Sequence, residues 1–332
     1  MAKATAKNGA VRFGLPVLVL ILVLIPPILT GGCSNTKATT TTTGLVSTTS
    51  TVAVLETTTS TTEGTTTTTG KPGETAVFHQ ETDARLVFAG TWESIAATTA
   101  SGQNFVVADA SGCSVTIRFH GTDISWIAKE SPAYGQAKVT LDGGAAQTVD
   151  LYSKTTVWKK TVWKSDTLTP DAHTVVIAWT GKKSAGATGT NINVDAIVVT
   201  GVVTGLYQQD DAQLAYIGTW NKTTASAASN GSFVSSDQTD ASVAIQFTGI
   251  DMTWIARTGP SYGQASVTVD GGPPITVDLY SAATKSQQQV WASGALEMGT
   301  HTIQIARLGK KNAASKGTAI NVDAFDVTGS LK

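Results

Sequence analysis

The side chains that could recognise a ligand gather in one short segment of the chain. It carries a cation, Lys129, an aromatic ring, Tyr134, and an amide, Gln136, within eight residues. An aromatic face can cover the C–H side of a sugar ring, while cations and amides read its hydroxyl groups. The same types recur further along the chain as Arg257, Tyr262 and Gln264. These six residues are candidate ligand contacts. In the alternative, Pro and Gly shape a loop and the tyrosine packs on the fold.

Trp158 is the best single candidate for a stacking platform. It lies among Lys154, Lys159 and Lys160, where an exposed indole favours contact with a ligand. The alternative is packing on its own sheet. The equivalent residue later in the chain is Ser286, so binding at Trp158 would make two otherwise similar regions differ in ligand or affinity.

Asp195 and Asp323 are candidate metal ligands. Each shares the alternation of the apolar residues around it, which predicts a buried carboxylate that must be hydrogen-bonded, paired or metal-bound. If first and last strands are neighbours, Asp83 and Asp211 come close and create an oxygen-rich calcium site. The alternative is that each aspartate accepts backbone N–H bonds. We expect no cofactor beyond this possible structural calcium.

Catalytic signatures are weak. His173 and His301 each follow a turn and precede an alternating segment, which favours a satisfied, partly buried histidine over a catalytic one. No nucleophile elbow or zinc-binding helix motif accompanies them. We therefore expect no enzyme, and a hydrolase is the least favoured class.

The elements that position these residues come from a duplication. The chain repeats itself without a gap at a constant offset of 128 residues, with about 60 identities between residues 81–201 and 209–329. Each repeat is long enough to enclose its own core. This predicts one domain over residues 76–203, the first copy, and another over 204–332, the second copy.

Alternating apolar residues indicate strands in both copies. Val115, Ile117 and Phe119 alternate with polar residues, and turn signals such as Asp142-Gly143-Gly144 separate successive segments. The prediction is an all-β protein with two tandem β-sandwich (jelly-roll) domains after a disordered stalk.

Both copies carry motifs that resemble the galactose-binding-like jelly rolls found with bacterial surface proteins and glycosidases. In the first copy the motifs are Phe119–Trp126, Tyr134–Ala137, Leu141–Gly143, Asp150–Tyr152, His173-Thr174 and Val194–Ala196. The resemblance covers roughly residues 77–329. It implies the fold, and domains that bind sugars, other polymers or proteins, or that serve as spacers.

The first 75 residues read as export and display segments. Residues 1–33 contain cations, an apolar run and small residues before Cys33, and resemble a bacterial lipoprotein signal with Cys33 as the lipidated residue. The alternatives are an uncleaved membrane anchor and a released form. Residues 34–75 are threonine-rich, which predicts a disordered stalk, glycosylated or passive. We expect an exported protein anchored to the outer face of a bacterial membrane, at the cell surface.

Composition excludes several classes of function. A net charge of −1 and a charged fraction of 14% disfavour nucleic-acid binding. Two cysteines exclude a disulfide scaffold or a four-thiolate zinc site, and Cys113 is expected to be a small buried thiol. The favoured hypothesis is a monomeric surface protein that binds a polysaccharide or glycan bivalently. The alternative is a structural or protein-adhesion protein without a sugar site.

Overall fold

The computed structural model describes residues 75–332. The expected leader, the stalk and Cys33 lie outside these residues. Between residues 75 and 332, no helix is long and apolar enough to cross a membrane.

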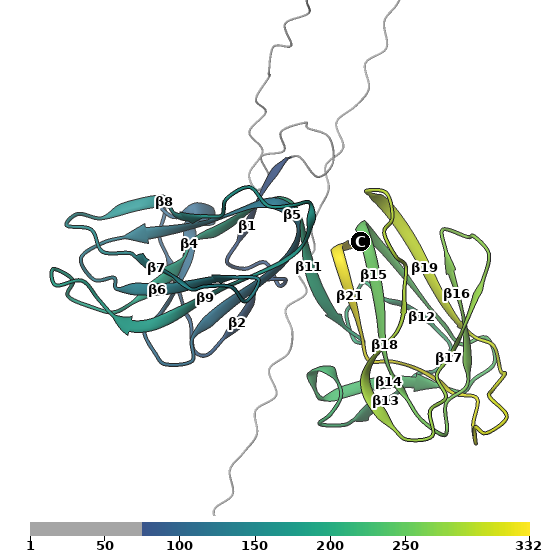
Figure 1. The fold of residues 1–332 in the computed structure, drawn as a ribbon. Helices are drawn as coiled ribbons and strands as arrows, with labels where there is room; N and C mark the ends of the chain where they lie inside the picture. The colour runs from purple at the N-terminus through teal and green to yellow at the C-terminus, as the bar shows by residue number, and fades with distance from the viewer. Residues whose placement is uncertain (1–74) are drawn as a thin grey trace, which may run out of the picture. The chain divides into compact units, whose positions relative to one another are not determined.

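The first copy consists of short and long strands and one 3₁₀ turn, η1 (Figure 1). They are β1 (Ala76–Gln80), β2 (Val87–Ala89), β3 (Glu93–Ala96), η1 (Ser101–Gln103), β4 (Asn104–Ala108), β5 (Ser114–Glu130), β6 (Gln136–Leu141), β7 (Gln147–Asp150), β8 (Val157–Lys164), β9 (Asp171–Lys182), β10 (Ile192–Val194) and β11 (Ala196–Gln208).

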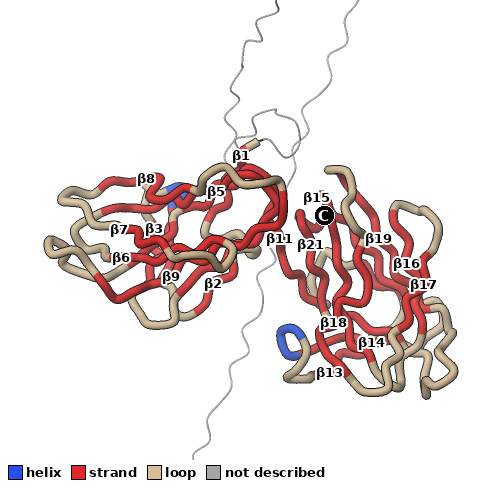
Figure 2. Tube along the Cα trace, viewed as in Figure 1, coloured by secondary structure: helices blue, strands red, loops and turns tan. Residues whose placement is uncertain are grey.

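The second copy repeats this series, again with a single 3₁₀ turn, η2 (Figure 2). Its elements are β12 (Ala215–Ile217), β13 (Asn221–Thr224), η2 (Ser229–Gly231), β14 (Ser232–Ser236), β15 (Ser242–Thr258), β16 (Gln264–Val269), β17 (Ile275–Asp278), β18 (Lys285–Ala292), β19 (Gly299–Arg307), β20 (Ile320–Val322) and β21 (Ala324–Leu331).

The long strand β5 organises the first copy. It pairs with β11 along one edge and with β9 and then β8 along the other. Its alternating residues Val115, Ile117 and Phe119 are buried, as the sequence pattern predicts. In the second copy β15 takes the same place, between β21 on one edge and β19 and β18 on the other.

A smaller layer packs on the large sheet in each copy. It is the three-stranded sheet β10-β4-β3 in the first copy and β13-β14-β20 in the second. Phe105 of β4 and Ile117 of β5 belong to one buried cluster, while a separate cluster fills the second copy. The predicted all-β fold of tandem sandwiches is confirmed.

First and last strands are neighbours, as expected. Ala76 of β1 pairs with Thr200 of β11, and the second copy repeats this register as Thr204 with Thr328. Since Thr204 also belongs to β11, the boundary predicted between residues 203 and 204 falls inside a continuous strand.

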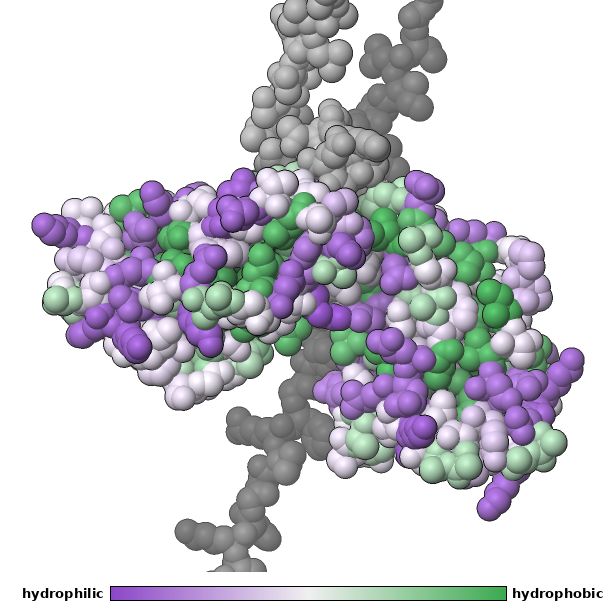
Figure 3. All heavy atoms as spheres, in the orientation of Figure 1, coloured by the Kyte–Doolittle hydropathy of each residue, from purple (hydrophilic) through white to green (hydrophobic). Residues whose placement is uncertain are grey.

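Polar and apolar side chains are interspersed over the face drawn in Figure 3. Large exposed apolar side chains come from different strands, among them Phe78, Ile217 and Ile275. The exposed apolar side chains therefore do not gather on one strand.

Candidate functional site

Three aromatic rings surround the ammonium group of Lys129 in the first copy. Its Nζ lies 4.3 Å from the centre of the Trp158 ring, 5.3 Å from that of Phe105 and 5.6 Å from that of Tyr134. Phe105 and Trp158 meet edge to face with their centres 5.4 Å apart. The structure thus brings together three of the predicted contacts, and we call these four residues the Lys129 cluster.

Buried Asn193 fixes the backbone that carries Lys129. Its Oδ1 accepts a hydrogen bond from the Lys129 backbone N–H at 2.8 Å, and its Nδ2 donates to the Lys129 carbonyl at 2.8 Å. The Trp126 indole N–H in turn donates to the Asn193 carbonyl. The buried side-chain amide of Asn193 therefore fixes the position of Lys129 on β5. Asn321 holds the backbone of Arg257 in the same way.

Burial differs sharply within the Lys129 cluster. Tyr134 is only 4% exposed and belongs to the core, and its burial raises the pKa of its phenol to about 12. Desolvation lowers the pKa of Lys129. Trp158 is half-buried against the core. The ring best placed to meet a ligand is therefore Trp158, while Tyr134 packs as the structural alternative describes.

The second copy has an equivalent cluster with fewer aromatic rings around its cation. The Arg257 guanidinium lies 4.7 Å from the centre of the Phe233 ring, which is equivalent to Phe105. Ser286 stands where the first copy has Trp158, and the buried Nε of Arg257 has no hydrogen-bond partner within residues 75–332. Tyr262 is half-buried, unlike Tyr134.

The two predicted glutamines are engaged elsewhere. Gln136 donates to Asp150 Oδ2 at 3.4 Å, and Gln264 donates to Asp278 Oδ2 at 3.3 Å. Each amide thus bridges two neighbouring strands, where it steadies the sheet.

Phe105 is a site residue that sequence reasoning missed. It lies within a short alternating strand and reads as ordinary core, which it also is. Its recurrence as Phe233 was the available signal, although recurrence alone does not separate a core ring from a site ring.

Buried oxygens without partners lie beside the 3₁₀ turn in both copies. Asp195 is 0% exposed, and its Oδ1 accepts from the Ser101 backbone N–H at 2.7 Å, while Oδ2 has no partner within the described residues. Gln80 donates to the Ser101 hydroxyl at 3.1 Å, which leaves its Oε1 unpaired. Both oxygens therefore converge near Ser101.

The second copy repeats this arrangement. Asp323 Oδ1 accepts from the Ser229 backbone N–H at 2.8 Å, and Asp323 Oδ2 and Gln208 Oε1 both lack partners in the described part of the chain. The same two oxygens, from equivalent residues, thus lack a partner in both copies.

Burial disfavours the charged forms of the carboxyl groups at this site, while the charges of Lys159 near Asp195 and of Arg257 near Asp323 act in the opposite direction. Burial raises the pKa of Asp195 to about 6 and also raises that of Asp323. Glu81, another buried carboxyl with an unpaired oxygen, has its pKa raised by burial and by the nearby charge of Asp195. Each copy offers two unpaired oxygens, those of Asp195 with Gln80 and of Asp323 with Gln208, whereas calcium takes about six to eight oxygen ligands.

The expected role of Asp83 and Asp211 in this site needs correction. Asp83 accepts hydrogen bonds from Arg85 and His79, and Asp211 accepts from the Gln213 backbone N–H. Asp83 and Asp211 therefore form hydrogen bonds within their own turns, and in the first copy the amide of Gln80 instead contacts Ser101, the residue that Asp195 binds. Across residues 75–332, no group of three or more His, Cys, Asp or Glu side chains is placed to hold a metal.

His173 and His301 are satisfied histidines. His301 Nδ1 lies 2.8 Å from Asp270 Oδ2 and its Nε2 lies 2.8 Å from the Glu297 carbonyl. Because both partners accept hydrogen bonds, both ring nitrogens donate and the imidazolium form is favoured. His173 makes the same contacts with Asp142 and Thr169.

Comparisons with known proteins place the chain near carbohydrate-active proteins. No family model matches it. A curated relative, named "A type blood alpha-D-galactosamine galactosaminidase" from Flavonifractor plautii, is 26% identical over 247 residues, which are 68% of this chain and 21% of the relative. The chain thus spans about a fifth of the relative's length.

Solved structures with low overall similarity include three carbohydrate-related proteins. A family 35 carbohydrate-binding module from Clostridium thermocellum is 18% identical with a TM-score of 0.27, covering 37% of this chain and 98% of the module. A Paenibacillus xanthan lyase is 17% identical with a TM-score of 0.30, covering 76% of this chain and 26% of the lyase. A family two carbohydrate esterase from Cellvibrio japonicus is 15% identical with a TM-score of 0.28, covering 39% of this chain and 34% of the esterase.

The expectation that the chain is not an enzyme is contradicted by these comparisons. The curated relative, which the chain matches over 247 residues, is named as a galactosaminidase. Sequence reasoning looked for local catalytic motifs, and a pair of carboxylates brought together by folding leaves no such motif. The chain is similar to carbohydrate-related proteins, and enzymatic activity is a candidate function.

Proposed function

We propose that the two domains bind a polysaccharide or glycan, and that the first copy makes its main contact through Trp158. The observation that carries this proposal is the half-buried Trp158 ring beside Lys129, in a cluster of aromatic rings at the end of β5. An indole face supplies apolar contact to a sugar ring, and the adjacent ammonium group supplies hydrogen bonds to hydroxyl groups.

Two domains of one chain make the proposed binding bivalent. The second copy offers Arg257, Phe233 and a half-buried Tyr262, without an equivalent of Trp158. Its site is therefore weaker, or selects a different sugar. A polymer that reaches both sites would be held more tightly than a short oligosaccharide, because the second contact forms at a high effective concentration.

The experiment measures retention of the full chain on a panel of polysaccharides and on glycans that end in α-linked galactosamine. The relative's name makes galactosamine a rational first probe. We expect retention by the intact protein and its loss when Trp158→Ala and Tyr262→Ala are combined. Trp92→Ala is the matched control, since Trp92 packs on Phe88 outside the Lys129 cluster. Absence of retention on every sugar would favour the structural or protein-adhesion alternative.

Hydrolysis is the second candidate function, favoured by the relative named as a galactosaminidase. The same incubations therefore include a measurement of released sugar. Sugar released by the intact chain would support hydrolysis, and retention without release would limit the described domains to binding.

We further propose that the protein is exported and anchored to the outer face of a bacterial membrane through Cys33. The order of basic, apolar and small residues before Cys33 supports this proposal. Cys33→Ser is expected to move the protein from the membrane fraction to the soluble fraction. Unchanged, detergent-dependent association would instead favour the uncleaved apolar anchor.

A further inference from the structure

Strand β11 belongs to both copies. Residues Ala196–Thr204 pair with β5 of the first copy, and residues Thr204–Gln208 pair with β21 of the second. The chain therefore passes from one sandwich to the next without leaving extended, hydrogen-bonded backbone, and the two large layers form a single sheet.

A bidentate ion pair joins the copies beside this strand. Arg118 of β5 donates from Nη1 to Asp326 Oδ2 at 2.7 Å and from Nη2 to Asp326 Oδ1 at 2.8 Å. The Arg118 side chain is 36% exposed and that of Asp326 is 21% exposed. Paired hydrogen bonds of this kind fix orientation as well as distance.

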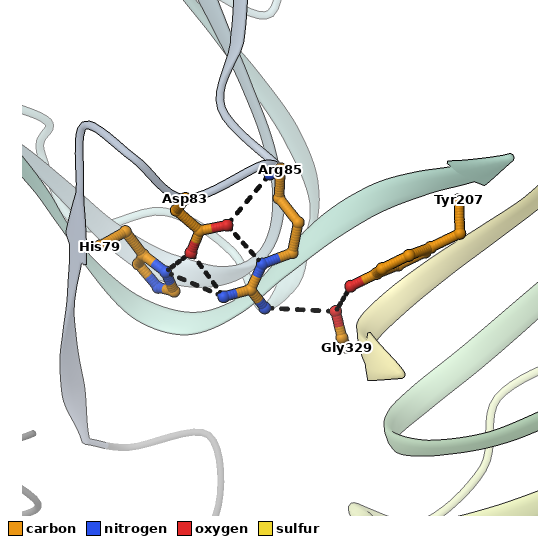
Figure 4. A network of polar contacts seen from close by, with 5 residues as sticks. All are labelled: His79, Asp83, Arg85, Tyr207 and Gly329. Carbon is orange, nitrogen blue, oxygen red and sulfur yellow. Dashed lines mark hydrogen bonds and ion pairs between the residues drawn. The ribbon is translucent and has the colours of Figure 1, made fainter. Parts of the chain in front are cut away.

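A second set of contacts meets at the carbonyl of Gly329 (Figure 4). Arg85 of the first copy donates to this oxygen from Nη1 at 3.2 Å, and the hydroxyl of Tyr207 donates to it at 3.4 Å. Asp83 holds the Arg85 guanidinium through Nε and Nη2, so Nη1 remains free to reach Gly329. His79 supports Asp83 from its other side.

The three charged residues that cross between the copies are not shared by them, whereas Gly329 and Asp83 recur as Gly201 and Asp211. Arg118 is replaced by Gln246, Asp326 by Val198 and Arg85 by Gln213 at the equivalent positions. About half of all aligned positions differ, so a difference alone carries little weight. The weight comes from chemistry, because Gln246 has no charge and Val198 has no acceptor, so neither could form the bidentate pair.

We propose that the two copies have diverged to form a dedicated head-to-tail interface, in which Arg85 and Arg118 of the first copy fix Gly329 and Asp326 of the second. The two copies then move as one body, and the spacing between the Lys129 cluster and Arg257 is set before any ligand binds. The interface concerns the free protein, so it stands or fails independently of glycan binding.

The test measures the distance between spin labels on the full chain without ligand. Labels are placed at Thr148→Cys and Thr276→Cys, equivalent exposed positions of the two copies. The native thiols are removed by Cys33→Ser and Cys113→Ala, the latter matching Ala241. Electron–electron double resonance should give one narrow distance distribution for this parent protein.

Substitutions that exchange residues between the copies then break the interface. The triple variant carries Arg118→Gln, Asp326→Val and Arg85→Gln. Each new residue is the one that the same fold accepts at the equivalent position of the other copy. This variant should broaden the distance distribution at least twofold. The charge swap Arg118→Asp with Asp326→Arg should restore most of the narrow distribution. Lys164→Gln is the control, because Lys164 pairs with Asp123 inside the first copy.

Hydrogen exchange separates interface loss from unfolding. Amides of Thr204–Gln208 should exchange faster in the triple variant, while those of Val115–Phe119 stay protected. A broad distribution in the parent protein, or an unchanged narrow one in the triple variant, would overturn the proposal.

Discussion

The ammonium group of Lys129 lies 4.3 Å from the centre of the Trp158 ring, so the protein's own cation covers one face of its best stacking residue. A cation over an indole face is a favourable contact. A sugar must therefore stack on the opposite face or displace the lysine. In the proposed function, either route would make Trp158 the main contact and give Lys129 a secondary role.

Replacement of Trp158 by Ser, the residue at the equivalent position 286, should weaken glycan binding by the first copy. Loss of an aromatic contact of about 1.5 kcal/mol corresponds to roughly a tenfold increase in Kd. Isothermal titration with the polysaccharide found by the retention assay measures the change.

The reciprocal change, Ser286→Trp, serves as the control for this prediction. It should strengthen binding by the second copy, because Phe233 and Arg257 already occupy the positions of Phe105 and Lys129. Equal affinity for all three proteins would rule out Trp158 as a contact residue.

Calcium should raise the melting temperature if Asp195 with Gln80, and Asp323 with Gln208, hold the ion. An ion present at 100 times its Kd stabilises the folded state by about 2.7 kcal/mol. Calorimetry after chelation and after calcium addition measures the shift. Asp195→Asn and Asp323→Asn together should abolish it while retaining the bonds from Ser101 and Ser229. If neither the chelator nor added calcium changes the melting temperature, the prediction of a calcium site is wrong.

Stability should fall as pH rises past about 6.5 because of the duplicated histidine–aspartate pairs. The hydrogen bond to Asp270 raises the pKa of His301 above its usual value. Its contribution is therefore fully present below the unfolded pKa of about 6.5 and is lost as pH rises through the folded pKa. We expect about 0.5 kcal/mol for each half-exposed pair.

Urea unfolding at several pH values measures this loss for the intact protein. His301→Gln with His173→Gln should flatten the profile between neutral and alkaline pH. An unchanged slope in the double variant would assign the dependence to other groups.

Alanine at Gly329 should destabilise the second copy strongly. Gly329 has a φ of +148°, and a Cβ there would overlap the carbonyl oxygen of Thr248 across the sheet. Strain and overlap together should cost about 2–4 kcal/mol. Gly271→Ala is the matched control, since its φ is +70° but nothing lies near the added Cβ. Chemical denaturation compares the two, and equal losses would refute the steric argument.

Much of the fold was predictable from two signals. The duplication indicates two similar domains, and the alternation of apolar and polar residues indicates which side chains are buried. Val115, Ile117 and Phe119 are buried as their alternation indicates. The pairing of the first and last strands also follows the expectation for this architecture. These features depend on local patterns, which a sequence displays directly.

The candidate site was predictable only in part. Lys129 and Trp158 each stand out from their neighbours in the sequence, although they lie on different strands, β5 and β8. Phe105 reads as core and comes from the three-stranded sheet. Asp83 was expected beside Asp195, but Arg85, two residues away, captures its carboxylate. Arg118 and Asp326 are 208 residues apart, and no local pattern connects them.

The shared strand β11 also has a consequence for biosynthesis. The segment Thr204–Gln208 leaves the ribosome before its partner β21, because the rest of the second copy lies between them in the chain. Until residues 324–331 emerge, that strand presents an open edge of unpaired backbone, which can pair with other chains. Chaperone contact during synthesis should therefore concentrate on this edge.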